Sequence, residues 1–125
     1  MKKRISTDRA PAAVGPYSQG IEAGGFIFVS GQLPATPDGD LITDDIAAAT
    51  KQSLENISAV LKAAGASLAD VVKVTVFLAD MDDFGAMNEV YKEFFSEPYP
   101  ARAAFAVKEL PKGAPLEIEA IAVRR

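Results

Sequence analysis

Arg102 has a local sequence that suits binding of a carboxylate. Pro98 and Pro100 favour extended backbone before it, and the small residues Ala103 and Ala104 leave room beside its side chain. A guanidinium is planar and pairs with a carboxylate through two parallel hydrogen bonds. Arg102 is therefore a candidate anchor for a small anion, although a surface arginine in a salt bridge would have the same local sequence.

Two glutamates in the final apolar segment are candidates for acid–base chemistry. Period-two alternation places Glu117 and Glu119 on the same strand face as Ile121 and Val123. A carboxyl beside apolar surface is partly desolvated, which raises its pKa toward that of a useful general base. Either glutamate could instead be an acidic side chain facing water, and the alternation does not choose between them.

Four further residues could line a site. Tyr17 lies in a turn-rich loop of residues 15–20, where its ring could wall a pocket and offer a hydroxyl group. Ser30 and Gly31 end an apolar segment, and a glycine allows a ligand close to the backbone. Asn88 lies outside the apolar stripe of its helix. Core packing, a simple turn and a solvated position are the respective alternatives.

The composition restricts the chemistry that these residues can perform. The 125 residues include no His and no Cys, which excludes thiol nucleophiles, Ser-His-Asp triads and Cys/His zinc sites. We expect no metal and no cofactor. The net charge of −4 argues against nucleic-acid binding, since the basic run at residues 1–4 is short. No segment is long and apolar enough to span a membrane, so we expect a cytoplasmic protein.

Hydrophobic periodicity divides the chain into strands and helices. The expected strands comprise residues 21–23, 26–30, 71–78, 103–107 and 116–123, with a further short strand near Ile5. Gly24 and Gly25 suit a hairpin turn. The order β-β-α-β-α-β-β over residues 1–125 predicts a single α+β domain with two helices on one face of the sheet.

The two helices have recognisable ends and apolar stripes. Thr43 or Asp44 is the expected N-cap of the first helix, which Gly65 ends, and Asp80 or Asp82 is the expected N-cap of the second. The stripes consist of Ile46, Thr50, Leu54, Ile57, Leu61 and Ala64 in the first helix, and of Phe84, Met87, Tyr91 and Phe94 in the second. Two helices leave the other sheet face uncovered, and its apolar side chains predict an oligomer.

Taken together, these segments resemble the RidA branch of the Rid family, also called YjgF. The resemblance runs through nearly the whole chain and rests on residues 10–20, 29–34, 70–78, 100–104, 110–113 and 117–123. It implies a chorismate mutase-like fold with a mixed sheet, and a homotrimer with a central barrel and ligand sites between subunits. It also implies 2-iminobutanoate/2-iminopropanoate deaminase activity, which converts reactive 2-imino and 2-enamino acids into 2-keto acids and ammonia.

The resemblance also implies roles for individual residues. Arg102 corresponds to the carboxylate-binding arginine of the family and Glu117 to the acid that positions the attacking water. The family residues that line the pocket correspond to Tyr17, Ser30, Gly31 and Asn88. The backbone groups that hold the ligand correspond to those of Gly31 and Ala104. Many bacterial members have Cys at the position of Ala104, so no thiol-dependent behaviour is expected.

Two other classes of function are compatible with the same family. Some members are described as translation inhibitors with endoribonuclease activity on RNA, which the acidic charge and the absence of His disfavour. A non-catalytic trimer that binds small ligands or acts as a chaperone is the other alternative.

Overall fold

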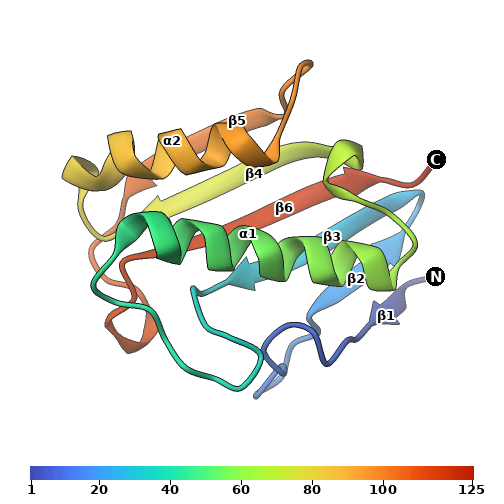
Figure 1. Cartoon of the computed structure of the whole chain (residues 1–125). Coiled ribbons are helices and arrows are strands. Elements are labelled where there is room, and N and C mark those ends of the chain that lie inside the picture. Colours follow the sequence, from blue (N-terminus) through green and yellow to red (C-terminus); the bar gives the residue numbers. More distant parts are fainter.

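The computed structural model describes residues 1–125 as one six-stranded sheet with two helices on one face (Figure 1). The strands are β1 (Lys3–Ile5), β2 (Gly20–Ala23), β3 (Phe26–Gln32), β4 (Val71–Leu78), β5 (Ala101–Ala106) and β6 (Leu116–Val123). The helices are α1 (Ile46–Ala63) and α2 (Phe84–Phe94), with short 3₁₀ turns at Leu68–Asp70, Met81–Asp83 and Pro111–Gly113. The expected α+β architecture is confirmed, including the short strand near Ile5.

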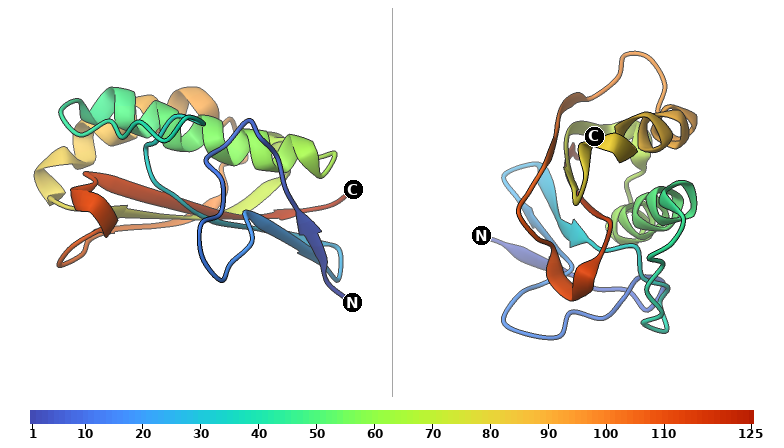
Figure 2. Two further views of the ribbon diagram at one scale, coloured as in Figure 1. Left: turned by 90° about the horizontal axis from the view of Figure 1, so that it is seen from below. Right: turned by 90° about the vertical axis from the view of Figure 1, so that its left-hand side faces the viewer.

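The sheet is mixed and has the order β1-β2-β3-β6-β4-β5. Only β4 and β5 are parallel, and α2 provides the crossover between them. Seen along the sheet in Figure 2, both helices lie on the same side and the opposite face carries no helix. A side chain of β5 or β6 therefore lies either beneath the helices or on the open face of the sheet, according to its position in the strand.

Alternation along β6 follows the expected pattern. Ile118, Ala120 and Ala122 are buried beneath the helices, whereas Glu117 and Ile121 are only partly buried on the other face. The α1 stripe packs into the same core, in which Leu54, Ile57 and Leu61 are fully buried.

The helix caps differ from those expected. Asp45, rather than Thr43 or Asp44, is the N-cap of α1, and its side chain accepts a hydrogen bond from Ala48 N at 3.1 Å. Asp45 is the residue with extended backbone immediately before the helix, the conformation that lets a cap side chain fold back. Asp80 caps the Met81–Asp83 turn rather than α2. That turn runs directly into α2, so the N-cap residue Asp83 makes no side-chain cap.

Strand β5 begins at Ala101, two residues earlier than expected, and so includes Arg102. Parallel pairing with β4 explains the difference, because Ala101 and Arg102 are level with Lys73 and Val74. The small residues of β5 are therefore paired from the first position after Pro100.

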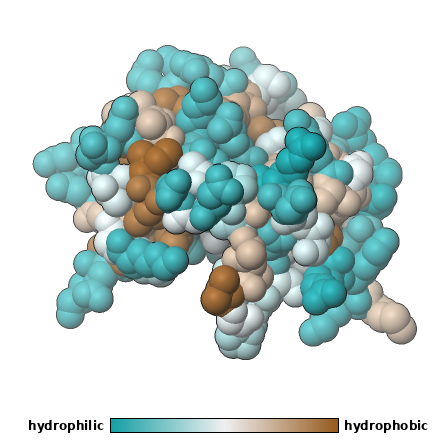
Figure 3. All heavy atoms as spheres, turned by 60° about the horizontal axis from the view of Figure 1, so that its bottom comes forward, coloured by the Kyte–Doolittle hydropathy of each residue, from teal (hydrophilic) through white to brown (hydrophobic).

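The open sheet face carries exposed aromatic side chains. Phe26 packs near Phe28, with ring centroids 6.1 Å apart, and Phe77 makes an edge-to-face contact with Phe105 at 5.7 Å. Phe26, Phe28 and Phe105 are each more than 40% exposed. The side of the molecule shown in Figure 3 is by contrast mainly hydrophilic. No helix has the combination of length and apolarity needed to cross a membrane.

Candidate functional site

A cavity of about 800 Å³ contains most of the expected site residues. Tyr17, Ser30, Gly31 and Glu117 all line it, together with the competing carboxylate Glu119. We call it the Glu117 pocket. Its remaining lining comes mainly from two loops and the last 3₁₀ turn, namely Pro11, Ala12, Val14, Ala35, residues 37–39, Pro111 and Lys112.

Gly31 brings the backbone of β3 close to the Glu117 carboxylate. The register between β3 and β6 shifts between Val29 and Gln32, so Ser30 and Gly31 lie in an irregular stretch of the strand pair. A β-carbon at position 31 would overlap Glu117 Oε2 and lie 2.8 Å from its Cδ. Strand irregularities of this kind commonly redirect backbone groups beside active sites.

The loop that carries Tyr17 is held by two buried or partly buried polar side chains. Gln19, 4% exposed, accepts a hydrogen bond from Thr7 N at 2.7 Å and donates to the carbonyl oxygens of Thr7 and Pro11 at 3.0 and 2.8 Å. Ser30 Oγ donates to Ser18 O at 2.5 Å. These bonds fix the course of residues 7–19 along the pocket.

The surroundings of Glu117 shift the pKa of its carboxyl group. Burial raises its pKa above the ordinary value of 4.5, and the nearby charge of Glu119 raises the pKa further. A carboxylate with a raised pKa accepts a proton more readily than an ordinary one.

Arg102 belongs to a different cluster, on the helix-covered face of β5. Its Nη1 donates to Asn88 Oδ1 at 2.7 Å. Its guanidinium carbon lies 4.7 Å from the ring centre of Tyr91 and 5.5 Å from that of Phe84. We call these four residues the Arg102 cluster. Ala104 follows two positions along the same face of β5 and packs against the core.

The two clusters lie on opposite faces of the sheet. Arg102 is level with Val74, which is buried beneath the helices, whereas Glu117 is level with Phe77 on the open face. Strand β4 separates β5 from β6, so the two residues are two strand spacings apart across the sheet, about 10 Å. They are also three residues apart along it, about a further 10 Å. One chain therefore does not bring Arg102 and Glu117 onto the same small molecule.

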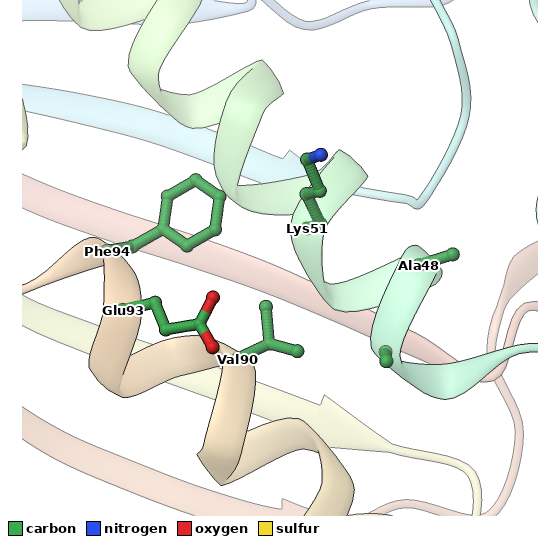
Figure 4. Close-up of a pocket in the computed structure, with 6 residues that line it drawn as sticks. Ala48, Lys51, Val90, Glu93 and Phe94 are labelled. Atoms are coloured by element: carbon green, nitrogen blue, oxygen red, sulfur yellow. The ribbon is translucent and has the colours of Figure 1, made fainter.

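A separate groove of about 410 Å³ lies between the helices (Figure 4). Ala48 and Lys51 of α1 and Val90, Glu93 and Phe94 of α2 line it. It contains none of the expected site residues.

No group of three His, Cys, Asp or Glu side chains is placed to hold a metal ion. The Glu117 pocket and the Arg102 cluster offer a carboxylate, a guanidinium, and the amide and hydroxyl groups around them.

Sequence reasoning missed part of each cluster. The sequence places Phe84 and Tyr91 only in the apolar stripe of α2. For Asn88 the local sequence favours a solvated position, and its place in the pocket is implied by the family resemblance. Phe84, Asn88 and Tyr91 are spaced at i, i+4 and i+7, which places them on one face of the helix. This spacing is the sequence pattern that indicates a shared site. No local pattern indicates that Gln19 holds the loop, because its hydrogen bonds to Thr7 and Pro11 depend on how residues 7–19 fold.

Comparisons with known proteins agree with this fold. The family model described as endoribonuclease L-PSP matches residues 7–124. A RutC family protein of Pyrococcus horikoshii is 55% identical over 125 residues, 99% of each chain. A Salmonella typhimurium protein named 2-iminobutanoate/2-iminopropanoate deaminase is 47% identical over 128 residues, with both chains fully covered. The crystal structure of Escherichia coli TdcF with bound serine has a TM-score of 0.93 at 49% identity and covers 98% of this chain and 99% of TdcF.

Proposed function

The chain belongs to the Rid family, also described as YjgF or endoribonuclease L-PSP proteins, and on that premise we propose that it hydrolyses 2-imino and 2-enamino acids. The products are the 2-keto acid and ammonia, and the substrates are 2-iminobutanoate and 2-iminopropanoate with its enamine form, 2-aminoacrylate. The observation that carries the proposal is the pair of groups that such a reaction needs, an oriented guanidinium at Arg102 and a desolvated carboxylate at Glu117.

Arg102 binds the substrate carboxylate. Asn88 accepts a hydrogen bond from Nη1, so the other N–H groups of the guanidinium remain to form a bidentate pair with the ligand. Because the imine carbon is bonded directly to the carboxylate carbon, fixing the carboxylate also fixes the electrophile.

Glu117 activates water. A protonated imine already has an electrophilic carbon, so no covalent nucleophile is required. Glu117 accepts a proton as water oxygen bonds to that carbon, which gives a carbinolamine. The proton then passes to nitrogen, the C–N bond breaks and ammonia leaves, and the hydroxyl proton is lost as the keto group forms.

The reacting pair is assembled from two chains of a homotrimer. Arg102 and Glu117 of one chain lie on opposite sheet faces, whereas the imine carbon and the carboxylate are adjacent in the substrate. A second copy packed on the exposed aromatic face, which includes Phe28 and Phe105, would bring its own cluster to the Glu117 pocket. In the assembled site one subunit contributes Tyr17, Ser30, Gly31 and Glu117. The next subunit contributes Asn88, Arg102 and Ala104.

A coupled assay tests the activity. A threonine dehydratase reaction releases 2-iminobutanoate, semicarbazide traps the imine, and the rate of 2-ketobutyrate formation is measured with and without this protein. We expect the protein to accelerate ketoacid formation and Arg102→Ala to remove the effect. An unchanged rate with the purified oligomer would rule out the deaminase.

The description of the family as endoribonuclease keeps RNA cleavage as a second candidate. The net charge of −4 and the absence of His argue against it. RNA cleavage that copurifies with the protein and is lost in Arg102→Ala would support that alternative instead.

A further inference from the structure

Arg102 is exposed, but its guanidinium contacts two aromatic rings and one amide group. The guanidinium carbon lies over two aromatic rings, at 4.7 Å from Tyr91 and 5.5 Å from Phe84. Residues 84 and 91 are about two helical turns apart, so the charged group lies between them. Asn88, in the turn between the two rings, takes one of its N–H donors.

The rings themselves are fixed by the core. Tyr91 is 4% exposed and packs on Phe95 with ring centroids 4.7 Å apart. Phe84 is partly buried against the core. The Tyr91 hydroxyl is buried and has no hydrogen-bond partner, so the ring face rather than the hydroxyl makes the contact with Arg102.

We propose that Phe84 and Tyr91 are positioning residues that hold the Arg102 guanidinium in its ligand-binding orientation before the carboxylate arrives. This inference rests on the proposed function, because it deepens the role given there to Arg102. A long flexible arginine loses rotamer freedom when it binds a ligand. Two aromatic faces and one amide impose that order in advance, through cation–π attraction and a directional hydrogen bond.

The preorganisation has a kinetic signature. Loss of a ring weakens substrate and transition-state binding equally, so KM rises while kcat is kept. A purely structural defect gives the opposite pattern, a lower apparent kcat from a smaller folded fraction with KM unchanged.

The experiment compares Phe84→Leu, Tyr91→Leu and Tyr91→Phe with Phe94→Leu as the matched control. Phe94 lies on the same helix but lines the groove between α1 and α2 (Figure 4). We expect KM for 2-iminobutanoate, and Kd for 2-ketobutyrate in calorimetry, to rise roughly two- to tenfold in Phe84→Leu and Tyr91→Leu. Tyr91→Phe and Phe94→Leu should keep the wild-type values. Phe84→Leu keeps the test valid if Tyr91→Leu does not fold.

A second readout does not depend on activity. The Nε–H proton of Arg102, assigned by its absence in Arg102→Lys, should be shielded by the ring currents in ¹H–¹⁵N spectra of the wild-type oligomer. That shielding should decrease in Phe84→Leu and Tyr91→Leu and persist in Phe94→Leu.

The outcomes separate this inference from the proposed function. If the wild type does not hydrolyse imines but the Arg102 signal moves as expected, the deaminase fails and the positioning role stands. If the wild type is active while Phe84→Leu and every folded Tyr91→Leu keep wild-type KM, Kd and Nε–H shift, the positioning role is overturned and the deaminase stands.

Discussion

The Glu117 carboxylate occupies the space in front of Gly31 in which any other residue would carry its β-carbon. Strand β6, an inner strand of the sheet, and the irregular stretch of β3 thus meet at one point of the Glu117 pocket. Glycine at this position lets the carboxylate lie directly against the β3 backbone.

Replacing Gly31 with Ala should displace the Glu117 carboxylate. The overlapping atom is at the end of a flexible side chain, so the strand keeps its position and the carboxylate moves. We expect kcat for imine hydrolysis to fall roughly 10- to 100-fold, the scale of a misplaced catalytic group. Thermal unfolding should be little affected. Gly85→Ala is the control, because a β-carbon there meets nothing within 4 Å. Wild-type kcat in Gly31→Ala would show that the Glu117 position does not matter.

The raised pKa of Glu117 predicts the acid limb of the pH–rate profile. Glu117 acts as a base only when ionised, so the rate should fall as the pH drops through a pKa above 4.5. Glu119 contributes to the rise through its charge. Glu119→Gln should therefore move the acid limb to lower pH while keeping kcat at neutral pH. An acid limb that does not move in Glu119→Gln would contradict the assignment of the limb to Glu117.

The same pKa shift predicts how stability depends on pH. A carboxyl whose pKa is raised on folding binds more protons in the folded state, so ionising it costs stability as the pH rises through the folded pKa. Glu117→Gln should raise the melting temperature at pH 8, and the gain should disappear below pH 4.5, the ordinary value of the group. Parallel melting temperatures for the two proteins across that range would be inconsistent with the desolvation of Glu117.

Much of this arrangement follows from local sequence, and part of it does not. Alternation in β6 predicts that Glu117 faces away from Ile118, because side chains in a strand point to alternate faces. The separation of Glu117 from Arg102 depends on the strand order β6-β4-β5, which no local pattern contains. The contact of Arg102 with Tyr91 is likewise between segments that only the crossover brings together. The local sequence picks out candidate residues, but it does not predict their division into two clusters on opposite sheet faces.

The exposed aromatic face predicts that an isolated chain is not the stable form. Phe28 and Phe105 are exposed on the face without helices, and covering such a surface favours association. We expect the wild type to elute as a trimer at micromolar concentration and Phe28→Glu to elute as smaller species, since a charge would be buried at the contact. Ala47→Glu, at an exposed position in the first turn of α1 on the helix-covered side of the sheet, is the control and should leave the trimer intact. A monomeric wild type would remove the basis for a site between chains.

The central claim is that Arg102 of one chain and Glu117 of another form a single site, and mixing two inactive variants tests it most directly. Arg102→Ala and Glu117→Gln oligomers are purified separately, unfolded together in equal amounts and refolded, and imine hydrolysis is measured against each variant refolded alone. Random mixing unites an intact Arg102 with an intact Glu117 at about a quarter of the contacts between chains. We predict activity near that fraction of the wild-type value. A mixed oligomer as inactive as its parents would contradict the claim, because every site confined to one chain would still carry a lesion.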